Sequence, residues 1–308
     1  MLGYLGEDNF LGGRMRLEAA KARHAIETAV ATPLGLDVAQ AAEGIIRVID
    51  VKMEEAIKAI STMRGHDLRD FMLLAFGGAG PLHAGRIARD LGMAGVIVPL
   101  YPGVFSAIGL LMSDVKHDYV RSKLTPLSEI SPADANGMFE HMVAQALDEL
   151  RDDGFSAEQI RIERALDMRY AGQGYEIAVS CPARSLQEAD LQQLRAAFDQ
   201  QHRTMFGHMA PEEPVEIVSY RVRGIGLVPP VEMPKFKPAG TTLADAQREM
   251  RRVRFDGKET DCPVYQRERL DVGLTVAGPA ILDQFDCTTV ICPGQTARVD
   301  EWKNLIVT

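Results

Sequence analysis

The chain has 308 residues, of which 46% are hydrophobic and 25% charged, so it can build a sizeable core in one large or two ordinary domains. Its formal net charge is −9, and an acidic chain repels phosphate backbones, which argues against a nucleic-acid-binding protein. Acidity does not exclude a small nucleotide, because a local group of backbone N–H donors can bind phosphate within an acidic protein.

The sequence also argues against membrane insertion and export. No apolar run approaches the roughly 20 residues that a membrane span needs, and Met1–Phe10 lacks the basic and apolar regions of a signal peptide. The four cysteines form no C-x-x-C pair, which favours free thiols over a metal site or disulfides. We therefore expect a cytoplasmic protein that makes no membrane contact and holds no metal through its cysteines.

The N-terminal part of the sequence has the apolar spacing of two helices. Apolar residues recur at helical intervals over 14–31, until Thr32–Gly35 breaks the pattern. Asp37 is placed to cap a second, longer helix that runs to Arg64 and ends before Gly65. The apolar residues of this second helix form a full stripe, which predicts that one face of it is buried.

An α/β pattern follows these helices. Residues 71–76 are a short, continuous apolar run that predicts a strand buried on both faces. This run leads into a glycine-rich turn, Gly77–Gly80, and Pro81 is well placed at the first position of the helix after it. The remaining elements are, in chain order, a helix over 82–91, a strand over 96–98 and a helix over 104–112. The alternation predicts an α/β fold class with a mixed or parallel sheet that is covered by helices.

The character of the sequence changes after about residue 123. An α+β region extends to about residue 235, and short strands with frequent glycine and proline then give a β-rich region to the end. The expected elements are helices over 132–153 and 187–206, strands over 160–166, 175–179 and 215–227, and a proline-rich connector over 229–240. We therefore expect one domain over 1–124 and a second region over 125–308.

The glycine-rich turn is the feature with the clearest chemical meaning. Glycines at 77, 78 and 80 let the backbone turn sharply and let a flat ligand lie close to it. The helix start that follows offers N–H donors and a positive dipole end, so the turn would suit the sugar and α-phosphate of a nucleotide. A purely structural connection between strand and helix explains the same pattern. Neither a P-loop sequence nor a G-x-G-x-x-G fingerprint is present.

The surrounding sequence resembles one family over essentially the whole chain. Residues Leu74–Ala84 resemble the glycine-rich adenosine motif of the hydantoinase A/5-oxoprolinase family, which includes N-methylhydantoinase A and acetone carboxylase subunits. Further stretches with the same resemblance are Asp8–Met15, Val98–Leu111, His117–Arg121, Arg169–Gln173, Gly278–Ile281, Thr288–Val290 and Pro293–Gly294. These runs are long and follow the family's order, which makes the match specific.

The resemblance implies the second half of an actin-like ATPase fold, of the sugar kinase and heat-shock chaperone type. In that fold two similar halves close on ATP, and the glycine-rich turn falls on the loop that binds adenosine. Phe105, Ser106 and Gly109 fall on the next helix, which packs near this loop. The candidate cofactor-binding residues that the resemblance implies are Gly77, Gly78, Gly80, Pro81 and Ser106.

Family members use ATP to activate a lactam or ketone oxygen, which is then hydrolysed or carboxylated, often with a second, B-type subunit. Phosphorylation turns a poor amide electrophile into one with a good leaving group, and its catalysis is mostly positioning and charge neutralisation. The resemblance thus implies part of an ATP-dependent amidohydrolase for a cyclic amide of the hydantoin or 5-oxoproline type. Two alternatives stay open, which are a subunit of an ATP-dependent ketone carboxylase and a non-catalytic scaffold subunit with the same fold.

One family feature has no counterpart in this sequence. Members normally carry a D-x-G-G-T-type phosphate loop in a preceding half, and neither Asp8 nor Gly12-Gly13 has its spacing. In the family the aspartate of this loop holds Mg²⁺, and its glycine and threonine residues grip the β- and γ-phosphates. We therefore expect the Mg²⁺ ligands and the catalytic acid on another half, in cis or in trans, and assign no catalytic residue here. A half-cleft would expose apolar surface, which predicts a homo- or hetero-oligomer.

Several polar residues outside the turn have two readings. His83 follows the glycine-rich turn, where it either contacts phosphate or substrate or packs locally. The segment Arg169–Glu176 is either a substrate or subunit contact or an exposed polar turn, and the basic run Arg248–Arg254 is a solvated or interface patch.

Two histidines are expected to be structural. His202 is spaced to pack between Phe198 and Phe206 on one helix. His117 and Asp118, as neighbours on a strand, point to opposite faces and so cannot share a metal ion.

Overall fold

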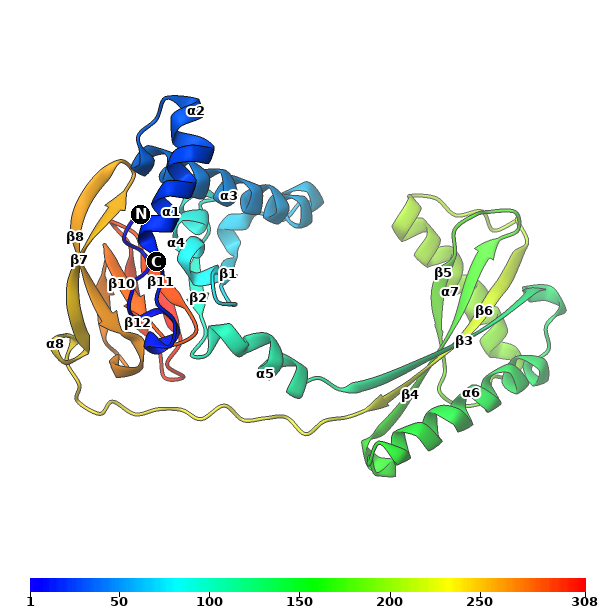
Figure 1. Cartoon of the computed structure of the whole chain (residues 1–308). Coiled ribbons are helices and arrows are strands. Elements are labelled where there is room, and N and C mark those ends of the chain that lie inside the picture. The colour runs from blue at the N-terminus through cyan, green and yellow to red at the C-terminus, as the bar shows by residue number, and fades with distance from the viewer. The chain divides into compact units, whose positions relative to one another are not determined.

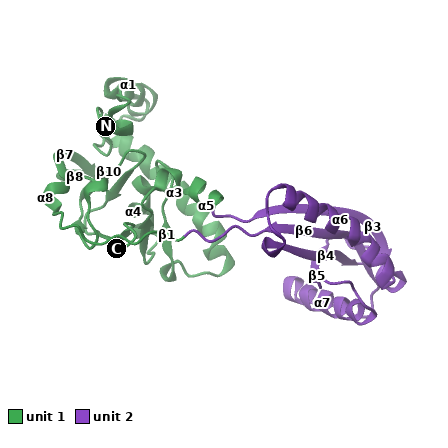
Figure 2. Cartoon of the chain, turned by 90° about the horizontal axis from the view of Figure 1, so that it is seen from below, with its two compact units in different colours: residues 1–111, 232–308 green, residues 112–231 purple.

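The computed structural model describes all 308 residues. They form two compact units: residues 1–111 together with 232–308 make unit 1, and residues 112–231 make unit 2 (Figure 2). The end of the chain therefore packs with its beginning. For this reason the compact units do not follow the division at residue 124 that the sequence suggests.

Unit 1 combines the α/β pattern of the first part of the chain with its β-rich end (Figure 1). Its helices are α1 (Ala19–Ile26), α2 (Thr32–Leu34), α3 (Val38–Ile60), α4 (Gly80–Asp90), α5 (Phe105–Leu111) and α8 (Leu243–Ala246). Its strands are β1 (Met72–Leu74), β2 (Gly95–Val98), β7 (Gln247–Phe255), β8 (Lys258–Gln266), β9 (Thr275–Ala277), β10 (Ala280–Asp283), β11 (Thr288–Ile291), β12 (Thr296–Val299) and β13 (Leu305–Val307).

The residues predicted to begin and end the first helices are found at those positions. Asp37 accepts a hydrogen bond from the Gln40 N–H, and the Gln40 side chain accepts one from the Asp37 N–H, which forms a capping box at the start of α3. Gly65 adopts the left-handed conformation after a short 3₁₀ turn that follows α3. The helix continues from α1 through a π-helical stretch over Glu27–Ala31 into α2 and ends at the left-handed Gly35, within the predicted break at Thr32–Gly35.

The strands of unit 1 form two sheets. The five-stranded sheet has the order β1-β2-β13-β12-β9, with β1 and β2 parallel and the other neighbours antiparallel. The four-stranded sheet has the order β11-β10-β8-β7, with β8 and β10 parallel. The expectation of a mixed sheet with helices is therefore confirmed, and the β-rich end of the chain completes it.

Two hydrophobic cores lie on opposite faces of the four-stranded sheet. Leu282 and Ile291 join a core with β2, α4 and strands of the five-stranded sheet. Their neighbours Ile281 and Val290 join a second core with Tyr4 and Ala42. Since alternate residues of a strand point to opposite faces, β10 and β11 are buried on both sides and fix the position of α4 above them.

Two expectations about burial are wrong. β1 is the edge strand of its sheet and not a doubly buried one, because Met72 and Leu74 are both exposed, Leu74 by 44%. The apolar stripe of α3 is only partly covered: Ala41 and Ala42 are buried, but Ile60 is 65% exposed. Apolar spacing predicts which face of an element is apolar, but it does not tell whether the same chain covers that face.

Unit 2 alternates strands and helices around one antiparallel sheet. Its elements are β3 (Val115–Pro126), α6 (Pro132–Asp152), β4 (Ile160–Tyr170), β5 (Ile177–Cys181), α7 (Glu188–Phe206) and β6 (Val215–Gly226). The strand order is β3-β6-β4-β5, and every neighbouring pair is antiparallel. The expected helices and strands are confirmed, and β4 is longer than its apolar pattern suggests.

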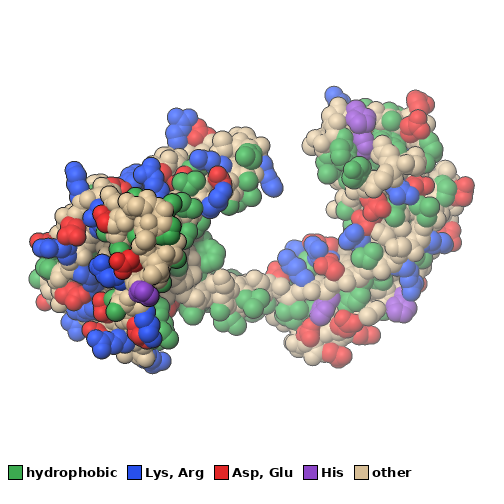
Figure 3. Space-filling view, turned by 45° about the horizontal axis from the view of Figure 1, so that its top comes forward, with side chains coloured by type: hydrophobic (Ala, Val, Ile, Leu, Met, Phe, Trp, Pro, Cys, Tyr) green, Lys and Arg blue, Asp and Glu red, His purple; other side chains and the backbone are tan.

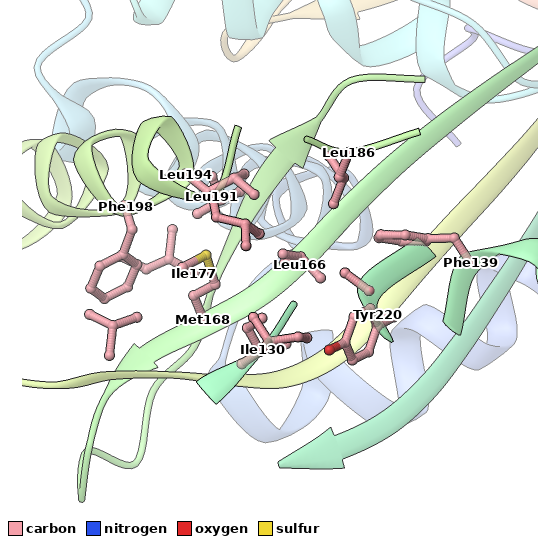
Figure 4. Close-up of a cluster of buried hydrophobic side chains, with 14 of the residues drawn as sticks. Ile130, Phe139, Leu166, Met168, Ile177, Leu186, Leu191, Leu194, Phe198 and Tyr220 are labelled. Atoms are coloured by element: carbon pink, nitrogen blue, oxygen red, sulfur yellow. The ribbon is translucent and has the colours of Figure 1, made fainter. Parts of the chain in front are cut away.

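The core of unit 2 lies on one face of its sheet, under α6 and α7. Phe139 of α6 and Phe198 of α7 are fully buried against Leu166 and Met168 of β4 (Figure 4). The opposite face is polar: Asp167, although only 3% exposed, accepts hydrogen bonds from Arg221 and Ser219. One helix-covered apolar face and one hydrogen-bonded polar face explain the alternating pattern of β4 and β6.

On the face drawn in Figure 3, acidic and basic side chains are interspersed. No helix combines the length and the apolar character that a membrane crossing requires. All four cysteines are unpaired. Burial raises the pKa of Cys181 and Cys287 to about 12 and that of Cys262 to about 11, so these three thiols stay protonated at neutral pH.

Candidate functional site

The glycine-rich turn lies between β1 and α4 and is tied to the segment that follows β2. The Ala75 N–H donates to the carbonyl of Ile97 (2.8 Å), and the Gly77 N–H donates to the carbonyl of Pro102 (2.7 Å). Gly77 has a φ of +82°, a left-handed conformation in which a side chain is strained. The turn is therefore fixed by backbone hydrogen bonds, and Gly77 is a glycine for a conformational reason.

The next residues of the turn are open on one side. Gly78 and Ala79 are exposed, and Gly80 is half-buried. A Cβ atom on Gly78 would lie 3.3 Å from the carbonyl oxygen of Asp286, whereas one on Gly80 would meet nothing closer than 3.9 Å. Sterically, Gly78 is thus the more constrained of these two glycines.

Helix α4 begins at the end of the turn without a side-chain cap. Pro81, which has no N–H, occupies its first turn, as the sequence predicts, and the Leu82 N–H donates to the Ala79 carbonyl (3.1 Å). The positive end of the helix dipole thus lies beside the exposed residues Gly78 and Ala79. Such a helix start favours an anionic group such as a phosphate.

Helix α4 is seated tightly on β11. The Gln295 side chain donates to the carbonyl of Gly85 (2.9 Å) and accepts from the Cys292 N–H (3.0 Å). A Cβ atom on Gly85 would lie 2.8 Å from the Gln295 Oε1 and 3.1 Å from the Val290 carbonyl oxygen, so glycine suits this close approach. The position of the helix start thus depends on strands from the end of the chain.

The segment from Val98 to Gly103 is also held by the end of the chain. Arg267 donates to the carbonyl oxygens of Val98 (3.2 Å) and Pro99 (3.0 Å), and burial lowers its pKa to about 10. The Gln284 side chain donates to the carbonyl of Leu100 (2.7 Å). Since Pro102 in this segment accepts the hydrogen bond of Gly77, these contacts also hold the glycine-rich turn.

Two aromatic rings lie beside the turn. Phe76 is 45% exposed, and its ring centroid is 5.5 Å from that of Phe105, at the start of α5. Ser106, the next residue of α5, is exposed, and no hydrogen bond links its side chain to the turn. The structure therefore brings α5 to the turn through Phe105, while Ser106 lies on the same helix without contacting the glycines.

A cavity of about 280 Å³ adjoins the turn. It is lined by Gly78 and Ala79, by the N-terminal segment around Asn9, and by residues 283–288 between β10 and β11. This volume falls just below the range of about 300–1,000 Å³ that is common for ligand pockets. A nucleotide at the turn would therefore be only partly enclosed by unit 1.

Comparison with known proteins identifies the family. Residues 1–119 match the profile described as hydantoinase/oxoprolinase, and residues 131–307 match that of the hydantoinase/oxoprolinase C-terminal domain. The chain belongs to the hydantoinase/oxoprolinase family. The expectation from the sequence motifs is confirmed.

The similar proteins of this family include an uncharacterised protein of Methanocaldococcus jannaschii, which is 34% identical over 98% of this chain and 42% of its own length. The caprolactamase alpha subunit of Pseudomonas jessenii is 31% identical over 97% of this chain and 44% of its own. The crystal structure of that ATP-dependent caprolactamase has a TM-score of 0.75, with 30% identity over 100% of this chain and 45% of that one.

A second similar solved structure is that of nucleotide-free acetone carboxylase, which carries out ATP-dependent acetone carboxylation. It has a TM-score of 0.84 and 28% identity, and the match covers 100% of this chain and 45% of the acetone carboxylase chain. The mixed α/β architecture with several sheets is therefore shared with both enzymes. The chain spans less than half the length of the relatives it matches.

Within this family member, His83 has a structural partner. Its Nδ1 lies 2.7 Å from the carboxylate of Asp50, which is only 2% exposed on α3. Arg86 donates to the same carboxylate (3.1 Å) and to the Tyr4 hydroxyl (2.8 Å). The local-packing alternative for His83 is therefore confirmed. No signal in the sequence points to Asp50, because its position in an apolar stripe looks like a mismatch.

The basic run Arg248–Arg254 lies on β7 and anchors other parts of unit 1. Arg251 donates to the carbonyl oxygens of Gly3 and Tyr4 (3.4 and 3.3 Å) and lies 3.3 Å from Asp283. Arg254 forms an ion pair with Glu43 of α3 (2.8 Å). These arginines are therefore internal contacts of unit 1 and not a purely solvated patch.

The remaining polar candidates are structural members of unit 2. His202 is buried, its Nδ1 lies 2.8 Å from the His208 carbonyl, and its ring contacts Phe198 and Phe206, which confirms its packing role. His117 pairs with Asp153 (2.7 Å), whereas Asp118 pairs with Arg223 (2.7 Å). The two neighbours therefore share no ligand.

The segment Arg169–Glu176 consists of the end of β4 and the turn after it. Tyr170 is 2% exposed, its hydroxyl donates to Asp199 (2.7 Å), and burial raises its pKa. Arg169 forms an ion pair with Glu216 (2.6 Å). The reading as an exposed polar turn is therefore wrong for these two residues, which belong to β4, whereas residues 171–176 are mostly exposed and contain the turn.

Proposed function

We propose that this chain supplies the adenosine side of the ATP site in an ATP-dependent hydrolase of a cyclic amide. Unit 1 would then be the second half of an actin-like ATPase fold. The observation that carries the proposal is the uncapped start of α4, which follows an exposed glycine-rich turn with Gly77 in a left-handed conformation. Support comes from the caprolactamase relative, which is ATP-dependent and acts on a lactam by its name.

The geometry suggests how the nucleotide lies. The exposed Phe76 ring, with Phe105 beside it, offers an apolar surface for the adenine. The backbone of Gly77, Gly78 and Gly80 borders the sugar and α-phosphate, and Pro81 sets the start of the helix whose dipole faces that phosphate. Ser106 is a candidate for the outer edge of the same site.

The Mg²⁺ ion and the catalytic acid are expected on a polypeptide portion with a D-x-G-G-T-type loop. Mg²⁺ prefers carboxylate and phosphate oxygens, and it would neutralise the charge of the β- and γ-phosphates. Relatives named as alpha and beta subunits support a hetero-oligomer, with that portion or a B-type subunit as partner. Such a complex would work in the cytoplasm.

A ketone carboxylase subunit is the second candidate. The acetone carboxylase structure has the higher of the two TM-scores, 0.84 against 0.75. Both reactions begin with phosphorylation of a carbonyl-type oxygen, so the adenosine side serves either. Substrate-dependent ATP hydrolysis by the assembled complex, measured with a lactam and with a ketone plus bicarbonate, separates the two.

Isothermal titration of the chain with ADP and with AMP, with and without Mg²⁺, tests the proposal. We expect weak binding of both nucleotides that does not depend on Mg²⁺ and that is lost in Gly78→Val, since the new side chain meets the Asp286 carbonyl. Gly44→Val is the matched control, because a Cβ atom on Gly44 in α3 meets nothing within 4 Å. Equal binding by both variants, or none by the parent chain, would count against the proposal and favour the scaffold alternative.

A further inference from the structure

The turn between β10 and β11, residues 284–287, reaches both loops of the candidate site. The Asp286 Oδ2 accepts a hydrogen bond from the Gly103 N–H (2.9 Å), three residues after the Leu100 carbonyl that Gln284 binds. The carbonyl oxygen of Asp286 is also the group that a Cβ atom on Gly78 would approach. One short turn from the C-terminal region thus touches the glycine-rich turn and the segment before α5.

The fit at Gly103 shows how close this contact is. A Cβ atom on Gly103 would lie 2.7 Å from both the Cβ and the Cγ atoms of Asp286 and would clash with its Oδ2. Gly103 does not have a positive φ, so its backbone does not require glycine. The small residue at 103 is therefore explained by the Asp286 side chain that occupies the adjoining space.

The contact continues to the nucleotide side. Pro102, the neighbour of Gly103, accepts the hydrogen bond of the Gly77 N–H (2.7 Å). A shift of Gly103 would move Pro102 and release Gly77 from its left-handed conformation. The carboxylate of Asp286 is thus linked to Gly77 through Gly103 and Pro102.

Burial of the Asp286 carboxylate has a free-energy cost that packing does not explain. Its Oδ1 is buried and has no hydrogen-bond partner. An unpartnered buried oxygen destabilises a protein, and such groups are kept where a site needs them. The β10–β11 turn itself is closed by the Gln284 N–H and the Cys287 carbonyl (3.0 Å), which does not involve the Asp286 side chain.

We propose that Asp286 is a positioning residue that sets the geometry of the glycine-rich turn through Gly103. The proposal rests on the proposed function in that the turn is taken to bind the adenosine part of a nucleotide. Asp286 lies in the region that matches the C-terminal domain of the family, and the proposal gives this region a role in the nucleotide site of the region before it.

A double-mutant cycle on the 308-residue chain tests this role, with Asp286→Gly, Gly103→Ala and the double variant. Each single variant should weaken ADP binding by about tenfold or more, because a charge-assisted hydrogen bond is lost or a clash is introduced. The double variant should bind no worse than Asp286→Gly, since the glycine removes the Cβ and Cγ atoms of Asp286 that the new methyl group would meet. If the two single losses of ADP affinity multiply in the double variant, the proposal is overturned.

The side-chain chemistry is tested by Asp286→Asn and Asp286→Leu. These side chains are close in size, but only asparagine can accept from the Gly103 N–H, so Asn should keep ADP affinity and Leu should lose it. This pair also tests the positioning role if the Asp286→Gly variant does not fold. Equal affinity of the two variants would contradict a positioning role.

Hydrogen exchange without nucleotide separates this proposal from the proposed function. The Gly77 amide should exchange faster in Asp286→Leu and Gly103→Ala than in the parent chain, with the melting temperature little changed. That result would uphold the positioning role even if the parent chain bound no ADP, which would count only against the proposed function. Unchanged exchange at Gly77 would overturn the positioning role.

Discussion

The edge strand β3 of unit 2 and the edge strand β1 of unit 1 differ in charge. β3 carries Lys116, Asp118, Arg121 and Lys123, and charged side chains hinder pairing with another strand. β1 consists of Met72, Leu73 and Leu74 and has no charge. The β3 edge is therefore protected by charge, whereas β1 offers an apolar edge directly before the glycine-rich turn.

The large buried side chains of unit 2 contrast with the exposed apolar residues around the glycine-rich turn of unit 1, where we propose that the nucleotide binds. Unit 2 gathers large, fully buried side chains such as Phe139 and Phe198 under two helices. Around the turn, unit 1 instead exposes Phe71, Leu74 and Phe76. Mutations should accordingly affect stability more in the core of unit 2 than at the exposed edge of unit 1, and binding or association most at that edge.

The largest effect on stability is expected from Phe139→Ala. This side chain is fully buried against Tyr220, with ring centroids 5.4 Å apart, so its removal leaves a cavity. Unit 2 should lose about 3–5 kcal/mol of unfolding free energy, whereas Phe71→Ala, at an exposed site in unit 1, should cost under about 1 kcal/mol. Urea denaturation measures both variants, and similar losses would contradict the contrast between the units.

A smaller loss of stability is expected from Gly77→Ala. Its φ of +82° costs a non-glycine residue about 1–2 kcal/mol, so the turn should rearrange or loosen. ADP binding should weaken while unit 2 unfolds as before, which calorimetry can follow. Gly44→Ala in α3, where no positive φ and no close atom oppose a side chain, serves as the control. Unchanged binding by the Gly77→Ala variant would argue that the conformation of Gly77 is not needed.

A pH-dependent effect is expected at Asp190 in unit 2. The hydrogen bonds from Arg184 and from the Gln187 N–H lower the pKa of this carboxyl group. Because the folded-state pKa lies below the unfolded value of about 3.9, the stabilisation is present above that pH and is lost as the pH falls through the folded-state pKa. Asp190→Asn should therefore be less stable than the parent at pH 7, with the difference shrinking below about pH 4. A difference that is constant with pH would exclude this ion pair as its source.

The smallest effect on stability is expected from Leu74→Lys on the open edge. Leu74 is 44% exposed, so the melting temperature should barely change. A charge on this edge should nevertheless reduce self-association of the chain, as charged residues do on other edge strands. Sedimentation velocity at several concentrations measures this, with Leu124→Lys on β3 of unit 2, 59% exposed, as the matched control. Equal association of both variants would contradict the role of β1.

The sequence predicted most elements because their signals are local. The capping box at Asp37, the proline at position 81 and the alternation in β6 each depend on neighbouring residues and appear as expected. The position of the glycine-rich turn between a strand and a helix start follows in the same way.

The parts that sequence reasoning missed depend on distant residues. The exposure of β1 follows from its place at the end of the strand order, which no local pattern contains. Asp50 and Asp286 act through partners 33 and 183 residues away. No local pattern explains Gly103 or Gly85, because the atoms that would meet a Cβ there belong to Asp286 and to Gln295 and Val290.

The central claim is that the glycine-rich turn of unit 1 binds the adenosine part of a nucleotide. Backbone amide chemical shifts of the chain, recorded during titration with AMP, test it most directly. We predict saturable shifts at Gly77, Gly78, Ala79 and Gly80, with the amides of the unit 2 sheet unchanged. Shifts confined to other residues, or none at millimolar AMP, would contradict the claim and leave the turn as a structural connection.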